Sequence, residues 1–168
     1  MSAHDNELLT AAEAADLDAV KAALGAGADV DARDAGGRTA RMLASMRSAI
    51  PIMELLLGAG ASADRQGALG ETALTLAASS RGGESIDLLL GHGADPNLGD
   101  RNRKRPLMWT VDTQFHRGFD TSANIAPLVR AGARVDADRT ALMWAVRGVG
   151  TSFDARRPGG ERRRRGRH

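Results

Sequence analysis

A run of four cations within five residues is the most distinctive chemical feature of this sequence. Residues 101–105 read RNRKR, three arginines and one lysine on a short segment. Such a cluster can attract an acidic protein segment or phosphate groups. Nucleic acid binding favours a broad basic face with aromatic side chains for base stacking. We therefore favour an acidic patch on another protein, and a solvated turn without a partner fits the pattern equally well.

A second basic cluster lies near the C-terminus. Residues 156–168 hold seven arginines and one glutamate, a charge of +6, whereas residues 1–155 hold 16 basic and 20 acidic residues, a charge of −4. Apolar residues are absent from Pro158 to His168, and we expect a disordered tail over residues 151–168. Four arginines there could bind nucleic acid or an anionic membrane through phosphate contacts, or be solvated without a partner: Arg162, Arg163, Arg164 and Arg165.

The sequence contains no set of residues that would assemble an active site. It has no cysteine and no tyrosine, and neither the G-x-S-x-G nor the G-x-x-x-x-G-K-[ST] motif occurs. The four histidines are scattered, without a spacing typical of metal ligands. We expect a non-catalytic protein that needs no cofactor and no metal. Acidic residues near the start disfavour a secretory signal, so we expect a cytoplasmic protein.

A glycine-containing phrase that recurs four times indicates which elements position these residues. The phrase reads LGAGAD at 24–29, LGAGA at 57–61, LGHGAD at 90–95 and VRAGA at 129–133. Gly27, Gly60 and Gly93 are 33 residues apart, and Gly132 follows after 39. A period of this size indicates stacked supersecondary units. Such a stack offers a long open surface rather than an enclosed pocket.

A second motif, in phase with the first, predicts where a helix begins in each unit. It starts at Thr39, Thr72, Arg105 and Thr140. Threonine at the N-cap accepts a hydrogen bond from the first turn, and Pro106 lies where its missing amide costs nothing. Apolar residues at helical spacing predict a second helix before each glycine phrase, where the glycine can end that helix in the left-handed conformation.

The two motifs together resemble the ankyrin repeat, whose consensus contains D-x-x-G-x-T-P-L-H-x-A-A and, later, L-L-x-x-G-A-D-V-N. The resemblance implies an all-α solenoid of stacked helix-turn-helix units with projecting, β-hairpin-like fingers over residues 6–150. It implies an N-terminal extension at 1–5, a cap at 6–33, and repeats at about 34–66, 67–99 and 100–138. A half-repeat cap would follow at 139–148.

Several residues depart from the consensus. Four positions lack the histidine that usually ties a finger to its helix, which leaves the order of the fingers open: Met42, Thr75, Met108 and Met143. Arg103 replaces the finger glycine and Arg105 the capping threonine, which predicts a looser turn in the third finger. About six extra residues around 114–124 are expected to form a loop, after which Asn124 would cap a shortened helix that contains Pro127.

The resemblance also implies a contact surface on the finger tips and the concave face of the first helices. Its polar residues, with two exposed apolar candidates, suit a protein interface, although some are expected to be merely solvated. The expected contact residues are Arg33, Arg38, Met46, Arg47, Gln66, Leu69, Glu71, Ser79, Ser80, Arg101, Asn102, Lys104, Asp112 and Thr113.

The aromatic residues lie in the last third of the chain. Phe115 and Phe119 join the expected contact set, because the extra loop that contains them either folds over the second helices or projects as a recognition element. Trp109 and Trp144 hold equivalent positions and are expected to pack in the core.

We therefore predict a monomeric, non-catalytic scaffold that binds another protein. Two alternatives stay open, a nucleic acid or membrane tether that uses the basic tail, and an inhibitor or immunity protein for an enzyme.

Overall fold

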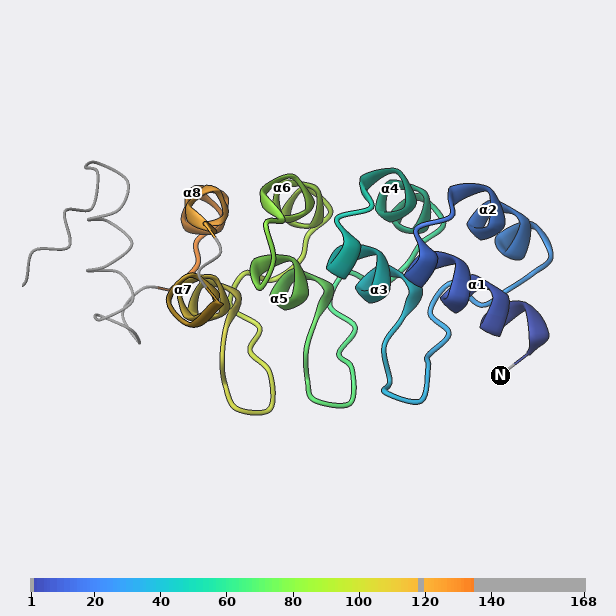
Figure 1. Cartoon of the computed structure of the whole chain (residues 1–168), viewed down its shortest axis with the longest axis horizontal. Coiled ribbons are helices and arrows are strands. Elements are labelled where there is room, and N and C mark those ends of the chain that lie inside the picture. Colours follow the sequence, from blue (N-terminus) through green and yellow to red (C-terminus); the bar gives the residue numbers. More distant parts are fainter. Residues whose placement is uncertain (1, 118–119, 135–168) are drawn as a thin grey trace, which may run out of the picture.

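The computed structural model describes residues 2–117 and 120–134 and arranges them as a stack of helical pairs (Figure 1). The first helices of the pairs are α1 (Ala3–Ala14), α3 (Ala40–Arg47), α5 (Ala73–Ala78) and α7 (Pro106–Arg117). The second helices are α2 (Leu17–Gly25), α4 (Ile50–Gly58), α6 (Gly83–Gly91) and α8 (Ile125–Arg130), the last preceded by a 3-10 turn, η1 (Ser122–Asn124).

The first helices form one layer and the second helices another, and three fingers project beyond the first layer (Figure 1). The described residues contain no strand, only an isolated bridge between Arg33 and Thr39 in the first finger. The predicted all-α solenoid is therefore confirmed. The half-repeat expected at 139–148 and the tail at 151–168 lie outside the described residues.

The helix ends follow the sequence motifs closely. The hydroxyl oxygens of Thr39 and Thr72 accept hydrogen bonds from the third amides of α3 and α5. The four phrase glycines lie just beyond the second helices with φ between +83° and +88°: Gly27, Gly60, Gly93 and Gly132. After each of them an amide donates back to a carbonyl five residues earlier, as from Ala28 to Ala23, which closes the helix end.

The N-terminal extension expected at residues 1–5 is wrong, because Ser2 caps α1 and the helix begins at Ala3. The Ser2 hydroxyl accepts the Asp5 amide, and the Asp5 carboxylate accepts the amide of Ser2. Asp5 also accepts the Asp29 amide at 3.0 Å. The Asp29 amide is the main reason why the pKa of Asp5 lies below its usual value, with the Ser2 contacts adding to it.

A continuous apolar core runs between the two layers. Neighbouring first helices pack on one another along the stack, and each second helix packs on its own first helix. The buried side chains come from every helical pair, and the largest apolar ones are Leu8, Met42, Ile52, Met53, Leu56, Leu74, Ile86, Leu89, Leu128 and Val20. Because each unit buries apolar surface against the next, the units stabilise one another. No helix of the described residues is long and apolar enough to cross a membrane.

Three polar side chains at 33-residue intervals fix the register between successive units. Asp31 accepts the Ser62 amide at 3.2 Å, Asp64 accepts the Asp95 amide at 3.0 Å, and Asn97 accepts the Arg134 amide at 2.6 Å. Each acceptor therefore binds the segment that follows the second helix of the next unit.

The three fingers are also joined to one another through their backbones. The Ala68 amide donates to the Gly36 carbonyl, and the Arg101 amide donates to the Leu69 carbonyl, both at 3.0 Å. Gly37 has a φ of +72°, and a Cβ there would lie 2.9 Å from the Ala68 amide nitrogen. Glycine is therefore required where one finger passes so close to the next.

The looser turn predicted for the third finger is wrong. The backbone amide of Arg103 donates to the Asp100 carbonyl at 2.8 Å, and the Asp100 amide donates to the Lys104 carbonyl at 3.1 Å. Asp34 forms the same pair of backbone bonds in the first finger, with Gly37 and Arg38. Arg103 achieves this with a φ of +62°, at the position that glycine holds in the other two fingers. The turn keeps its shape, and the backbone strain falls on Arg103.

The extra residues of the third repeat also differ from the prediction. Residues 114–117 continue α7, which has 12 residues where α5 has six, so the insertion is partly helical. Asn124 precedes α8 but does not cap it with its side chain. The side-chain Nδ2 of Asn124 instead donates to the Ala78 and Ser80 carbonyls, at 3.3 and 2.7 Å, and connects the insertion to α5. Pro127 lies in the first turn of α8, where it is tolerated as expected.

One of the two arginine side chains of α3, that of Arg41, lies in the core at a position that leucine holds in α5 and α7. Arg41 is only 1% exposed and donates to the carbonyls of Ala61 and Ser62. Its Nε atom is buried without a hydrogen-bond partner. Burial lowers the pKa of the Arg41 guanidinium, and the charges of Asp31 and Asp64 oppose that shift.

Replacing Arg103 by glycine should stabilise the protein. Relief of the left-handed strain, about 1–2 kcal/mol, exceeds the backbone entropy that glycine adds to the unfolded chain, about 0.5–1 kcal/mol. The urea midpoint of Arg103→Gly should therefore rise. Arg101→Gly, at a neighbouring exposed residue without a positive φ, should lower it, and a decrease in both variants would contradict the analysis.

Replacing Arg41 by leucine should leave the free energy of unfolding unchanged or raise it, because a well-packed apolar group often matches a buried charge. Arg41→Ala should lower it by about 3 kcal/mol, because it leaves a cavity between α3 and its neighbours. Urea unfolding of both variants checks this. A leucine variant as unstable as the alanine variant would show that the guanidinium contacts to Ala61 and Ser62 are indispensable.

The first finger should lose stability in acid through Asp34. Burial raises the pKa of this carboxyl, but the amide, guanidinium and charge of Arg38 and the Gly36 amide together lower it below its usual value. The Asp34 carboxylate therefore stabilises the fold fully above the pKa that it has in the unfolded chain, about 3.9. This stabilisation is lost as the pH falls through the lower pKa that Asp34 has in the folded protein. Asp34→Asn should consequently show a smaller loss of urea midpoint than wild type between neutral pH and pH of about 3. Glu54→Gln, an exposed change on α4, should follow the wild-type curve, and an Asp34 variant that also follows it would refute the assignment.

Candidate functional site

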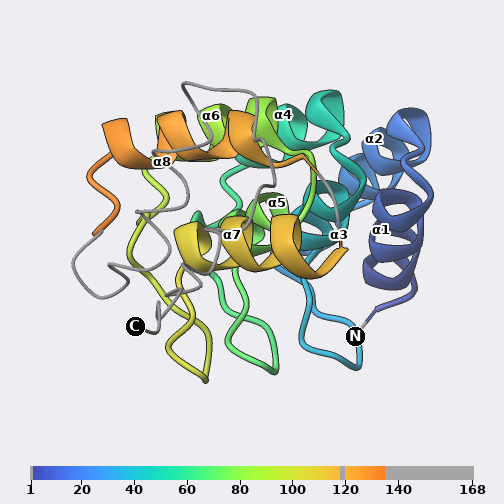
Figure 2. The same ribbon diagram turned by 60° about the vertical axis from the view of Figure 1, so that its left-hand side comes forward.

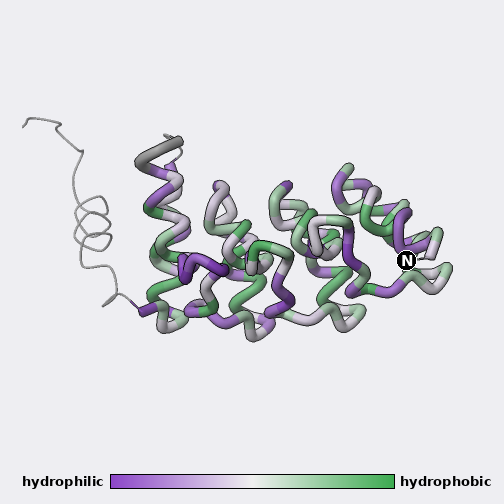
Figure 3. The backbone as a smooth tube through the Cα atoms, turned by 90° about the horizontal axis from the view of Figure 1, so that it is seen from below, coloured by the Kyte–Doolittle hydropathy of each residue, from purple (hydrophilic) through white to green (hydrophobic). Residues whose placement is uncertain are grey.

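The finger side of the stack brings together the residues that the sequence analysis singled out. The three fingers lie side by side beneath α3, α5 and α7 (Figure 2). Seen from that side, hydrophilic segments alternate with apolar ones along the whole stack (Figure 3). The expected residues that are well exposed are Arg33, Met46, Arg47, Leu69, Arg101 and Asn102. Those that are half-buried are Arg38, Gln66, Glu71, Ser79, Ser80, Lys104 and Asp112.

One expected contact residue does not join this surface, and the structure does not describe the side chains of two others. Thr113 is only 2% exposed, so its inclusion is wrong: it lies on the inner side of α7. Phe115 lies in α7 rather than in a loop, and its side chain is outside the described residues. Phe119 lies outside them altogether, as does Trp144.

In the first finger the charged groups neutralise one another. The Arg38 guanidinium lies 2.7 Å from the Asp34 carboxylate, which also accepts the Arg38 amide at 2.8 Å. Both side chains are largely covered. Arg38 is therefore committed to holding the turn, whereas Arg33 stays exposed beside it.

The second finger presents an apolar residue at its tip. Leu69 is 71% exposed, while its amide donates to the Glu71 carboxylate at 2.8 Å. Gln66 donates to the carbonyls of Gly70 and Gly99, at 2.9 and 3.1 Å, and so connects the second finger to the third. Gln66 and Glu71 thus stabilise the fingers, and Leu69 is the group that the finger offers to solvent.

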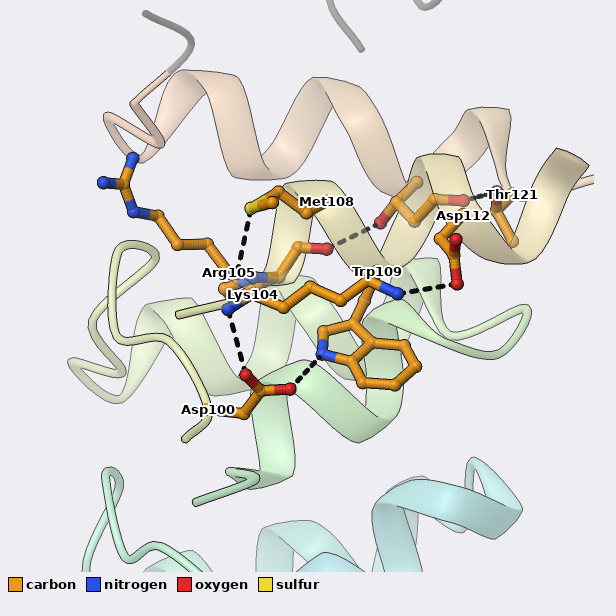
Figure 4. A network of polar contacts seen from close by, with 9 residues as sticks. Asp100, Lys104, Arg105, Met108, Trp109, Asp112 and Thr121 are labelled. Atoms are coloured by element: carbon orange, nitrogen blue, oxygen red, sulfur yellow. Dashed lines mark hydrogen bonds and ion pairs between the residues drawn. The ribbon is translucent and has the colours of Figure 1, made fainter. Parts of the chain in front are cut away.

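The third finger is anchored to α7 by a polar network (Figure 4). The Asp100 carboxylate accepts the amides of Asn102 and Lys104 and, at 3.2 Å, the indole nitrogen of Trp109. The Lys104 ammonium lies 2.6 Å from Asp112 and 3.8 Å from the centre of the Trp109 ring, a cation–π geometry. These contacts hold the finger in place although the family histidine is absent from this repeat.

Trp109 packs against the core as expected, but its side chain remains only partly buried. No sequence pattern predicted the network around it. The spacing of the four residues could have indicated this network. Asp100 begins the finger turn and Lys104 ends it. Trp109 and Asp112 lie one turn apart on α7, the helix that follows. Only folding brings the finger back over that helix.

The ends of the first helices contribute a smaller set of exposed groups. Met46, at the end of α3, is 46% exposed. Arg47 donates to the Glu13 carbonyl at 3.2 Å, which links α3 to α1. Ser79 and Ser80 donate to carbonyls of α5 and close that helix. Arg47, Ser79 and Ser80 are thus hydrogen-bonded within the stack, whereas Met46 is an exposed apolar side chain.

Within the described residues nothing resembles a catalytic or metal centre. No group of three or more potential ligands could hold a metal ion there. An open hollow of about 690 Å³ lies at the N-terminal end of the stack between α1 and α2, lined largely by alanines. Its ionisable members are engaged locally, Asp16 as the cap of α2 and His4 with Glu7 at 3.1 Å. Such a hollow lacks the convergent groups that catalysis requires.

Comparison with known proteins agrees with the arrangement of helices and fingers. A family model described as ankyrin repeats, in three copies, matches residues 8–100, more than half of the chain. No curated protein matches the sequence. Ankyrin repeats are generally protein–protein interaction modules and are typically non-catalytic. With its stacked helical pairs, its hydrogen-bonded fingers and this match, the chain belongs to the ankyrin repeat family.

Proposed function

We propose that this protein is a non-catalytic scaffold that binds a protein partner along its fingers and the finger side of α3, α5 and α7. The observation that carries the proposal is the backbone connection between neighbouring fingers, from Ala68 to Gly36 and from Arg101 to Leu69. These bonds order the exposed edge before any partner arrives. A surface that is already ordered loses less conformational entropy on binding, which favours affinity.

The composition of this surface supports the same conclusion. Protein interfaces are enriched in aromatic residues, methionine and arginine, and a few such residues contribute most of the affinity. The finger side offers a partly exposed Trp109, the exposed side chains of Met46 and Leu69, and Arg101. Trp109 is held in one orientation by Asp100 and Lys104, which makes it a rigid contact for a partner.

The two alternative functions, a tether that uses the basic tail and an inhibitor of an enzyme, stay predictions. The tether would depend on Arg162 to Arg165, which lie outside the described residues. No contact in the described part of the chain favours enzyme inhibition over other kinds of protein binding. The monomeric state and the cytoplasmic location are likewise expectations from the sequence.

Photo-crosslinking tests which face binds. Benzoylphenylalanine placed at Met46 or Leu69 should give a crosslinked product with a partner in an extract of the native source. The same group at Lys21 or Glu54, exposed residues of the second helices, should give much less. Equal crosslinking from both layers would contradict a binding face on the finger side.

Alanine variants then measure the contribution of the face. The triple variant Leu69→Ala, Arg101→Ala and Lys104→Ala should bind the crosslinked partner at least about tenfold more weakly, the loss expected for one interface residue of ordinary importance. Lys21→Ala with Glu54→Ala serves as the matched control. Circular dichroism should be unchanged in both, and full affinity of the folded triple variant would exclude these residues as the site.

A further inference from the structure

In each of the three fingers, the carboxylate of the finger forms hydrogen bonds within its own turn. Asp34 accepts the Arg38 amide and guanidinium, Glu71 accepts the Leu69 amide, and Asp100 accepts the amides of Asn102 and Lys104. Each finger contains one acidic residue, and its oxygens point back into the turn to reach these amides. The negative charge of the fingers is thus bound internally.

Two cations of the third finger are not bound in this way. Arg101 and Arg103 are exposed, and neither forms an ion pair within the described part of the chain. Lys104, in contrast, is bound to Asp112 and lies over Trp109. The tip of the third finger therefore presents two free guanidinium groups to solvent. One of them, on Arg103, is carried at a position where the other fingers have glycine at positive φ.

An exposed apolar side chain lies next to these cations. The Leu69 carbonyl accepts the Arg101 amide at 3.0 Å, so the tips of the second and third fingers are adjacent. A Cβ on Gly70 would lie 3.2 Å from Cγ of Arg101, which shows how closely the two turns approach. Leu69 itself is 71% exposed. The combined tip offers two cations beside one apolar contact.

This combination favours a polypeptide over a nucleic acid. Single-stranded nucleic acids bind through cations together with aromatic faces on which bases stack. Among the described side chains the only phenylalanine, tyrosine or tryptophan ring is that of Trp109, which is covered on one face by the Lys104 ammonium and has its nitrogen bound to Asp100. An apolar side chain such as Leu69 contributes little to a phosphate backbone, whereas acidic side chains and an aliphatic one occur together in a protein segment.

We propose that the tips of the second and third fingers bind an acidic protein segment. Its carboxylates lie against Arg101 and Arg103, and one of its apolar side chains lies against Leu69. Guanidinium groups suit this task because they bind carboxylates through two parallel hydrogen bonds. The inference rests on the proposed function, and it adds the chemistry of the partner.

Selection from a display library of random dodecapeptides tests the inference with the full chain as bait. Wild type should enrich peptides rich in Asp and Glu that carry at least one aliphatic or aromatic residue. The double variant Arg101→Glu and Arg103→Glu should lose the acidic preference and enrich basic peptides. Leu69→Ser should keep the acidic preference and lose the apolar one. The matched control, Lys21→Glu with Arg130→Glu on the second helices, should enrich the same peptides as wild type.

Direct binding of the enriched peptide completes the test. Fluorescence anisotropy should show at least a tenfold weaker affinity for the Arg101→Glu, Arg103→Glu variant, and added salt should weaken binding to wild type. Enrichment of non-acidic peptides, the absence of any enrichment, or tighter binding of oligothymidine than of the acidic peptide would each overturn the inference. If that happens while crosslinks from Met46 and Leu69 persist, the protein-binding function stands and only the acidic partner is rejected.

Discussion

The register between successive units is the constraint on which the rest of the structure depends. Asp31, Asp64 and Asn97 each accept an amide just beyond the second helix of the following unit, and the apolar core continues from one unit to the next. Because these acceptors recur at the period of the helices, every unit meets its neighbour in the same way. The fingers then come close enough to bond to one another, and an extended edge is formed from segments that are each only a few residues long.

Two arginines in this regular frame occupy energetically unfavourable positions. Arg41 occupies a core position where the next two units have leucine, and Arg103 occupies a left-handed position where the preceding two fingers have glycine. The frame tolerates them for different reasons. Arg41 finds carbonyl acceptors at the boundary with the next unit, and Arg103 lies at an exposed tip where only the backbone is strained. The first is a matter of stability, whereas the second places a charge where a partner can reach it.

The third unit differs most from the others, and its additional side-chain contacts compensate for the turn residues that it lacks. Its finger lacks both the glycine and the capping threonine, yet Asp100, Lys104, Trp109 and Asp112 tie it to an α7 that is twice as long as α5. Asn124 and Thr121 then join the chain beyond α7 to carbonyls of α5 and α7. Side-chain contacts thus replace the missing turn residues. The finger with the most unpaired positive charge is also the one most heavily braced, which suits a group that must hold its position when a partner binds.

The sequence by itself determined the stack. Glycines at a 33-residue period ended the second helices, threonines began α3 and α5, and apolar spacing placed the core, because these features act through the local backbone and need no knowledge of neighbours. Only the tertiary structure decided which surface residues are free. Thr113 is covered, Gln66 and Glu71 are used within the fingers, Asn124 reaches back to α5, and Lys104 lies over Trp109, whereas Leu69, Arg101 and Arg103 remain open to solvent. The reason is physical: whether a polar side chain is committed depends on acceptors and donors that other units bring near it, and no local pattern in the chain encodes that proximity.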